Sequence, residues 1–175
     1  MNLDALDGTI GQGWGGLSPN GSHANVILAR RGSPTAAAAM SMFAHPAPGH
    51  TPVMVCVGER QVDYEPVWPP TLMINKSTAL EERHQTLTWG AAQLGIGQGV
   101  LDAVAAGLID ATNELIVMVC IWVDPAAHDE TALRHACRAA TLAGIEECVN
   151  GRSATAAARL VDERDSLASP FYHGD

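Results

Sequence analysis

The feature that most constrains the fold is an uninterrupted apolar run at residues 115–123, LIVMVCIWV. Nine residues are far fewer than the roughly 18 needed to span a bilayer. A continuous apolar run of this length, rich in β-branched side chains, is typical of a strand that is buried on both faces. An alanine-rich segment at about 129–149 follows and predicts a helix that ends at Asn150 and Gly151. The chain should therefore fold around a buried strand covered by helices.

Further strands and helices are predicted on either side of this strand. Residues 22–30 (SHANVILAR) indicate a strand, and Ser33 is a good N-cap for a helix with Pro34 in its first turn, continuing to about residue 43. Residues 53–57 (VMVCV) predict another strand buried on both faces, and residues 71–75 a short strand.

A long helix is predicted from about 79 to 106, because leucines recur along it at spacings of seven, and Gly107 should end it. Each glycine inside it costs about 1 kcal/mol relative to alanine. These glycines should therefore allow close backbone packing or interrupt the helix at a site; they are Gly90, Gly95, Gly97 and Gly99. The tail from residue 152 has no strong periodicity.

Strands alternate with helices, and neither a repeat nor a linker divides the chain. We therefore expect an α/β (α+β) fold in a single domain over residues 1–175, with a β-sheet covered by helices. Hydrophobic residues make up 47% of the chain but aromatic residues only 5%, so small side chains must fill the core.

Charge argues against one class of partner. Ten Lys and Arg residues against 19 Asp and Glu give a net charge of −9, whereas proteins that grip nucleic acid rely on clustered positive charge. Nine of the basic residues are arginine, and Lys76 is the only lysine. The first residues show neither the basic flank nor the apolar stretch of a signal peptide. We expect a cytoplasmic protein without a membrane or nucleic-acid partner.

Two sequence patterns could suggest a binding site but do not support one. Residues 11–16 match GxGxxG, but turn residues follow where a dinucleotide site needs a helix. The cysteines show no CxxC pairing and should be buried as small apolar residues, so neither a disulfide framework nor a metal site is expected; they are Cys56, Cys120, Cys137 and Cys148.

Histidines are the other candidates for chemistry. His84, in the polar stretch EERHQ, is expected at the surface, and His128 and His135 are expected to be solvated or packed. His45 and His50 belong to a loop and should stabilise a turn or be exposed. His23 starts a strand, where a side chain can face a cleft, although residue pattern alone favours an ordinary structural role for both His23 and Lys76.

The order of several segments resembles the formaldehyde-activating enzyme family, and the resemblance runs almost end to end. It is carried by SHAN at 22–25, ARRGSP at 29–34, GHTPVMVCV at 49–57, PPTLMINKST at 69–78 and WGAAQLGIGQGVLDAVAAG at 89–107. The resemblance implies a fold like that of ribosomal protein S five domain 2. It also implies a homopentamer with sites between subunits.

The same resemblance implies an activity, the condensation of formaldehyde with tetrahydromethanopterin to methylene-tetrahydromethanopterin and water, in one-carbon metabolism and formaldehyde detoxification. His23 falls at the position of the family's general acid. The positions of its substrate-binding residues are occupied by Asn25, Met54, Lys76, Thr78 and Gln93. The pterin is a co-substrate, and no permanently bound cofactor or metal is implied.

An imidazolium suits this chemistry, because it can protonate the hydroxyl that a carbinolamine must lose near neutral pH. Arg30, Arg31 and Lys76 are candidates to offset the negative charge of the chain where an anionic coenzyme docks, together with the helix start at Ser33 and Pro34.

Three positions depart from the family pattern. Asn25 replaces an aspartate, Ser77 a valine, and WGAAQ at 89–93 the usual FGPAQ. Losing the aspartate charge should make His23 less basic than in the usual form. These departures also leave open a non-catalytic paralogue that binds formaldehyde or a pterin as a sensor or carrier.

Overall fold

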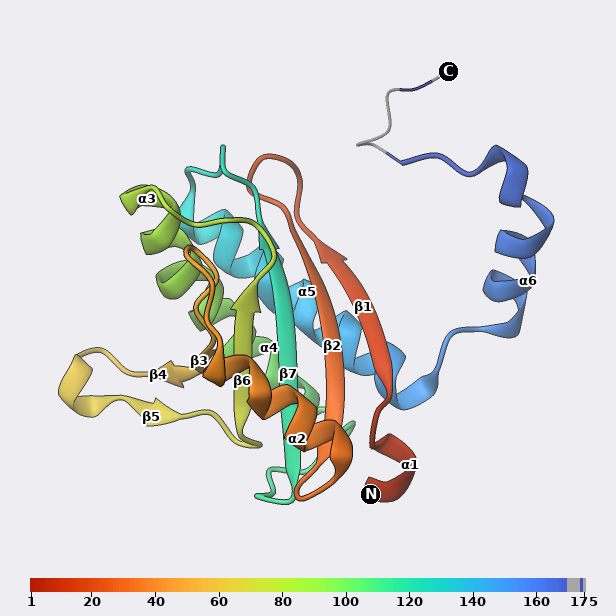
Figure 1. The fold of residues 1–175 in the computed structure, drawn as a ribbon, viewed down its shortest axis with the longest axis horizontal. Coiled ribbons are helices and arrows are strands. Elements are labelled where there is room, and N and C mark those ends of the chain that lie inside the picture. The colour runs from red at the N-terminus through yellow and green to blue at the C-terminus, as the bar shows by residue number, and fades with distance from the viewer. Residues whose placement is uncertain (170–173, 175) are drawn as a thin grey trace.

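The computed structural model describes residues 1–169 and 174 and contains a five-stranded mixed sheet (Figure 1). The order of the strands is β1-β2-β7-β6-β3, and only β6 and β7 run parallel. The strands are β1 (Ile10–Gly15), β2 (Ser22–Arg30), β3 (Val53–Met54), β6 (Thr71–Asn75) and β7 (Leu115–Val123). The predicted strands at 22–30, 71–75 and 115–123 are confirmed.

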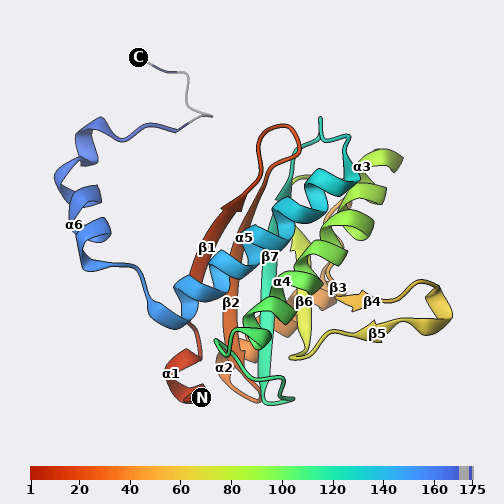
Figure 2. The same cartoon turned by 180° about the vertical axis from the view of Figure 1, so that it is seen from behind.

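Two long helices cover one face of the sheet (Figure 2). Helix α5 (Glu130–Asn150) packs on β1 and β2, and α4 (Gln93–Ala105) packs on α5. Asp129 caps the start of α5, and the helix ends where it was predicted to end, with Gly151, at a φ of 72°, following it. The expected fold class is confirmed, since the chain forms a single-domain α+β fold with a mixed sheet packed against helices.

The predicted long helix is confirmed in outline but begins later. Helix α3 (Glu82–Thr86) continues through a π-helical segment (Leu87–Ala92) into α4, and Gly107 follows with φ of 71°. A Cβ at Gly95 or Gly99 would collide with backbone carbonyls of α5, so these glycines allow the two helices to pack closely. Gly90 lies in the π-helical segment, where a Cβ would meet nothing.

Strand β1 was not predicted, because half of its residues are glycine. Gly11, Gly13 and Gly15 alternate along it and face α5. A Cβ at Gly13 would overlap the carbonyl oxygen of Ala140. The GxGxxG match is therefore part of a strand that packs tightly against a helix, and a hairpin turn follows it as the sequence indicated.

The prediction of one buried strand at 53–57 is wrong. The chain leaves the main sheet after β3 and forms β4 (Cys56–Val57), which pairs with β5 (Glu65–Pro66) in a separate hairpin that projects from the body (Figure 1). Val55 between them is fully buried and exchanges backbone hydrogen bonds with Thr71 and Val67. Its neighbours are only partly buried or exposed, because Val53 and Met54 lie on the edge strand β3 and Cys56 and Val57 belong to the separate hairpin.

The opposite face of the sheet is only partly covered. Helix α2 (Pro34–Met40), capped by Ser33 as predicted and continued by a 3-10 turn (Ser41–Ala44), crosses one half of this face (Figure 1). Beyond it, Cys120 and Trp122 are only half-buried, so β7 is not buried on both faces along its whole length. The uncovered half of this face carries the site described below.

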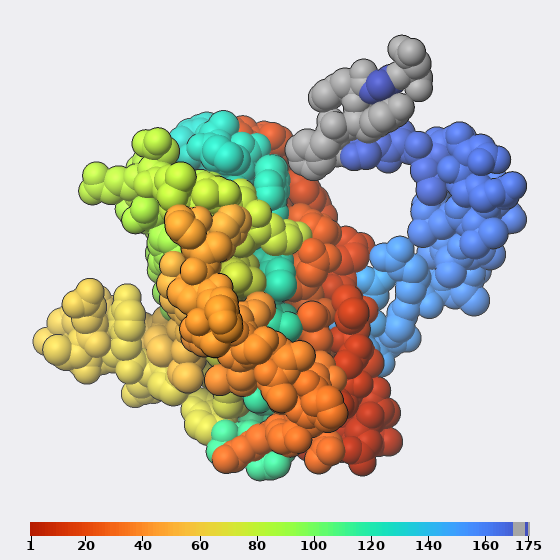
Figure 3. Space-filling view, viewed as in Figure 1, coloured from red at the N-terminus to blue at the C-terminus, as the bar shows by residue number. Residues whose placement is uncertain are grey.

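Short elements complete the described chain. Helix α1 (Leu3–Leu6) precedes β1, 3-10 turns span Gln61–Asp63 and Arg164–Ser166, and α6 (Ala154–Asp162) stands away from the body (Figure 3). None of the helices in residues 1–169 is long and apolar enough to cross a membrane. The domain expected over 1–175 includes residues 170–173 and 175, which lie outside the described part.

Candidate active site

Two rows of side chains cross the uncovered part of the sheet. The strand register places Trp14, His23 and Trp122 side by side on β1, β2 and β7. The indole rings of Trp14 and Trp122 stack with 5.8 Å between their centroids, and Trp14 lies 6.2 Å from the ring of His23. In the next row Asn25 lies between Gln12 and Cys120.

Lys76 joins the two rows. It directly follows β6, and its backbone N–H donates to the carbonyl of Ile121 at 2.7 Å, which brings the residue next to β7. Its Nζ lies 2.6 Å from Nδ1 of His23 and 2.8 Å from Oδ1 of Asn25. Residues 23, 25 and 76, all expected at the site, therefore form one hydrogen-bonded cluster.

These contacts fix the tautomer of neutral His23. Because the lysine nitrogen donates to Nδ1, the ring proton lies on Nε2, which is 3.0 Å from Oε1 of Gln12 and donates to it. Gln12 thus holds the far side of the imidazole ring. Asn25 contacts Lys76 and reaches His23 only through it.

Both titratable groups of the cluster are shifted towards their neutral forms. Partial burial lowers the pKa of His23, and the neighbouring positive charge of Lys76 lowers it further. Burial also lowers the pKa of Lys76. Interaction with Cys120 raises it, but by less than burial lowers it. The lowered pKa of His23 has its causes in burial and Lys76, whereas the effect predicted for the replacement of aspartate by Asn25 stays a prediction.

A cavity of about 330 Å³ opens on this cluster and is lined by Trp14, His23, Lys76 and Trp122. The two indoles make its wall largely apolar, and the histidine and lysine supply its polar groups. Such a cavity suits a small uncharged molecule placed against an acid and an amine.

Thr78 lies two residues beyond Lys76 and contacts His50, one of the two histidines assigned to a loop. Nδ1 of His50 donates to the carbonyl of Asn75 at 2.9 Å, so Nε2 accepts the hydroxyl of Thr78, also at 2.9 Å. Asn75 is buried and donates through Nδ2 to the carbonyl of Gly49. His50 therefore stabilises the turn that presents Lys76 and Thr78.

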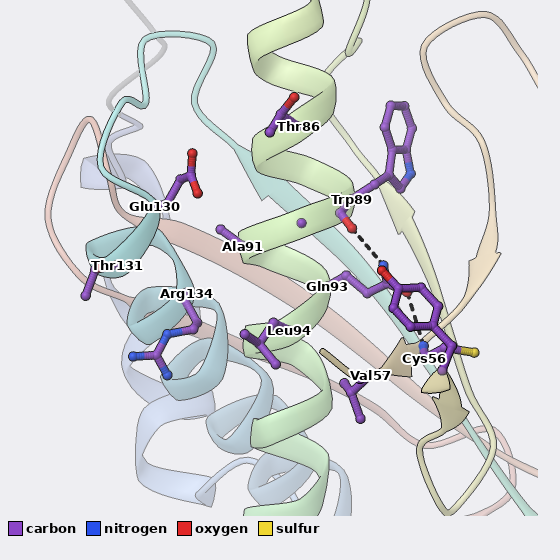
Figure 4. Close-up of a pocket in the computed structure, with 13 residues that line it drawn as sticks. Cys56, Val57, Thr86, Trp89, Ala91, Gln93, Leu94, Glu130, Thr131 and Arg134 are labelled. Atoms are coloured by element: carbon purple, nitrogen blue, oxygen red, sulfur yellow. Dashed lines mark hydrogen bonds between the residues drawn. The ribbon is translucent and has the colours of Figure 1, made fainter. Parts of the chain in front are cut away.

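Gln93 lies in a different cavity, of about 380 Å³, between the helices and the β4–β5 hairpin (Figure 4). Its Oε1 accepts the backbone N–H of Cys56 at 3.1 Å, and its Nε2 donates to the carbonyl of Trp89 at 2.7 Å. Nε1 of Trp89 is buried without a hydrogen-bond partner among the described residues. Met54, on β3, is 49% exposed.

The charges expected to help an anion dock are not gathered at the cluster. Arg30 ends β2, seven residues or about 23 Å along the strand from His23. It pairs with Asp4, and Arg31 pairs with Glu114. The start of α2 already faces a carboxylate of the chain, because Ser33 donates to Asp7 at 2.7 Å. Of these groups Lys76 alone lies at the cluster, and a docking role for the others stays a prediction.

The remaining histidines and cysteines differ in how deeply they are buried. His128 and His135 are exposed, whereas His84 is buried, with Nε2 at 3.1 Å from the carbonyl of Val123, so its surface assignment is wrong. Cys137 and Cys148 are buried as expected, and Cys56 and Cys120 are half-buried. Burial raises the pKa of Cys137 to about 12. No group of three potential metal ligands occurs within residues 1–169 and 174.

Sequence reasoning missed several residues that shape the two cavities. Only strand register reveals that Trp14, Gln12 and Trp122 surround His23, and β1 itself was hidden by its glycines. Arg134 lines the cavity of Gln93 and bonds Gln98 through Nη1 at 2.8 Å (Figure 4). Within the described chain it is the one arginine without an ion pair to a carboxylate.

Fold and site together define an α+β protein with a histidine–lysine acid–base cluster on the open face of a mixed sheet. Comparison with known families adds a specific assignment: residues 10–172 match the model of the formaldehyde-activating enzyme (Fae) family. The chain belongs to this family.

Individual relatives agree with this assignment. The chain is 27% identical to 5,6,7,8-tetrahydromethanopterin hydro-lyase of Methanosarcina barkeri, over 98% of this chain and 95% of that protein. It is 29% identical to the bifunctional enzyme Fae/Hps of Methanosphaera stadtmanae, over 69% of this chain but 29% of the relative. It is 24% identical to the bifunctional enzyme Fae/Hps of Methanothrix thermoacetophila, over 81% of this chain and 36% of that relative. The similarity thus covers about a third of each bifunctional relative.

Proposed function

We propose that this protein condenses formaldehyde with tetrahydromethanopterin, or a related tetrahydropterin, to give the methylene derivative and water. The observation that carries the proposal is the contact of 2.6 Å between Nζ of Lys76 and Nδ1 of His23 beside a small apolar cavity. Family membership and the name of the hydro-lyase relative support the same chemistry.

His23 acts as the general acid in this proposal. A secondary amine of the pterin adds to formaldehyde and gives a carbinolamine, whose hydroxyl is a poor leaving group until it is protonated. His23 takes a proton from Lys76 or from solvent and passes it to this hydroxyl. Water then leaves, and the second pterin amine closes the methylene bridge. A positioned acid contributes about 10²–10⁴-fold to such a step.

Lys76 and Asn25 position the imidazole and the polar edge of the substrate. Thr78, held by His50, presents a hydroxyl next to them. We further propose that Met54 and Gln93 contact the pterin, because Gln93 keeps one N–H and one lone pair after its two internal bonds.

Arg134 is the better candidate for an anionic part of the coenzyme, since it lines the cavity of Gln93 and lacks a carboxylate partner in the described chain. Arg134→Gln should raise the KM for the pterin several-fold and leave kcat nearly unchanged. Arg60→Gln removes the same charge from the β4–β5 hairpin and is the matched control, with KM expected to stay within twofold of the unmodified protein.

We also propose that the protein assembles as a homo-oligomer, a pentamer as the family resemblance implies, and acts in the cytoplasm. The uncovered sheet face supports assembly, because it exposes large apolar side chains, including 52% of Trp14. Light scattering coupled to gel filtration tests the stoichiometry, and a mass equal to one chain would contradict it.

The catalytic proposal is tested by His23→Ala. The variant should lose the acceleration of methylene-tetrahydromethanopterin formation while it still folds and binds the pterin by calorimetry. His128→Ala changes an exposed histidine and should keep the full rate. An unchanged rate in His23→Ala would refute the role of this residue. Pterin binding by the unmodified protein without any acceleration would instead assign the carrier function.

A further inference from the structure

Among the described residues, Lys76 shares only with Arg134 the lack of a carboxylate partner. It is the only lysine, and it contacts two uncharged side chains, His23 and Asn25. Within residues 1–169 and 174, no carboxylate forms an ion pair with it, whereas eight of the nine arginines have such a partner. In this part of the chain, no carboxylate therefore holds Lys76 in its charged form, and interaction with Cys120 offsets the effect of burial only partly.

The hydrogen bonds of Lys76 match a neutral amine. An uncharged –NH₂ group has two N–H donors and one lone pair. The two donors are satisfied by Nδ1 of His23 at 2.6 Å and Oδ1 of Asn25 at 2.8 Å, since neither acceptor can donate to the amine in this arrangement. The lone pair is left without a partner among the described residues, and Lys76 lines the apolar cavity between Trp14 and Trp122.

We propose that Lys76 is a nucleophile that captures a small aldehyde covalently as an imine. The cavity beside it, of about 330 Å³ and walled by two indoles, has room for a small carbonyl compound next to the amine. Capture needs no pterin and is thus a second activity beyond the condensation; the choice of formaldehyde as its substrate rests on the proposed function.

His23 supplies the proton transfers that this step requires. His23 takes a proton from solvent, and the free lone pair of the neutral Lys76 amine forms the N–C bond to the carbonyl carbon. The carbonyl electron pair moves to oxygen, which gains a proton as the nitrogen loses one, giving the carbinolamine. The imidazolium of His23 then protonates the hydroxyl, the C–O bond breaks, and water leaves. The nitrogen lone pair forms the C=N bond, and addition of water reverses the capture.

The composition of the chain fits this activity. Surface lysines would react with formaldehyde indiscriminately, whereas the nine guanidinium groups stay protonated and are poor nucleophiles. The single lysine is placed beside a proton acceptor and partly out of water, which are the conditions that activate lysine amines.

The test uses ¹³C-formaldehyde and cyanoborohydride, without a pterin, and locates the methylated residue by peptide mass spectrometry. The matched control is the double variant Lys76→Arg with Arg31→Lys, which also has one lysine but carries it at an exposed position. At neutral pH we expect Lys76 to be methylated several-fold faster than the lysine at position 31, because Nδ1 of His23 lies next to it and its lowered pKa gives a larger fraction of free amine. His23→Gln should slow the labelling of Lys76.

Labelling of Lys76 no faster than that of the exposed lysine would overturn the proposal, as would label found only at the amino terminus. This result would leave the condensation untouched, because turnover with the pterin is measured separately. Rapid labelling of Lys76 in a protein that does not accelerate the condensation would uphold the capture and contradict the proposed function.

Discussion

Asn25→Asp places a carboxylate beside Lys76 and changes two observables in opposite directions. Oδ1 of Asn25 is 2.8 Å from Nζ of Lys76, so the substitution creates an ion pair without altering the size of the side chain. At an effective dielectric constant of about 20, unit charges 4 Å apart attract by about 4 kcal/mol. Exposed pairs contribute about 0.2–1 kcal/mol because water screens them.

The cluster is half-buried, so we assume an attraction between the new carboxylate and Lys76 of about 1.4 kcal/mol in the variant. This attraction raises the pKa of Lys76 by about one unit. Below that pKa, the free amine and the rate of aldehyde capture should fall about tenfold. The carboxylate contacts His23 only through Lys76 and should raise the pKa of the imidazole by about half a unit. The imidazolium population, and with it the acid-catalysed condensation, should then rise up to about threefold.

The assay follows the ¹³C-methyl signal of Lys76 for the capture rate, an NMR titration of His23 for its pKa, and methylene-pterin formation for the condensation. Among the described residues, His23 and Cys120 are the titratable side chains that interact with Lys76, so their titrations are followed together. Asn113→Asp, in an exposed turn before β7, adds the same charge elsewhere and should change none of these quantities. Capture that is unchanged or faster in Asn25→Asp would refute the reasoning.

Other predictions concern stability. Gly13→Ala should lower the free energy of unfolding by about 2 kcal/mol and Tm by about 6 °C in calorimetry, because the new methyl group overlaps the carbonyl of Ala140. Gly90→Ala, where a methyl group meets nothing, should raise the unfolding free energy by about 0.5–1 kcal/mol, and a loss would contradict the open space there. Hydrogen bonds from Arg138 lower the pKa of Asp102, so their contribution is present above the unfolded pKa and disappears as the pH falls through the lowered one. Asp102→Asn should therefore be less stable than the native protein at pH 7 in urea titrations and equally stable in strong acid.

Long apolar runs and helix caps made much of the fold predictable. The run at 115–123, the cap at Ser33 and the helix end at Gly151 act locally, so their structural consequences can be read from neighbouring residues. Strand β1 could not be predicted in this way. Its glycines oppose strand formation locally, and only the close approach of α5 explains them.

At the site, the identity of the residues could be predicted from the sequence, but their electrostatics could not. The resemblance placed His23, Asn25 and Lys76 together, and the structure brings them within hydrogen-bonding distance. Their electrostatics could not be read from the sequence, because the pKa of His23 depends on burial and on a lysine 53 residues away. The prediction that His84 lies at the surface was wrong for the same reason, since a polar local sequence does not reveal that its ring is buried against Val123.

The most direct test of the central claim is the rate of methylene-tetrahydromethanopterin formation from formaldehyde with and without this protein, using tetrahydrofolate as the comparison substrate. We predict a saturable acceleration over the spontaneous reaction that increases in proportion to the protein concentration. A rate equal to that of the spontaneous reaction, at protein concentrations where calorimetry detects bound pterin, would contradict the claim.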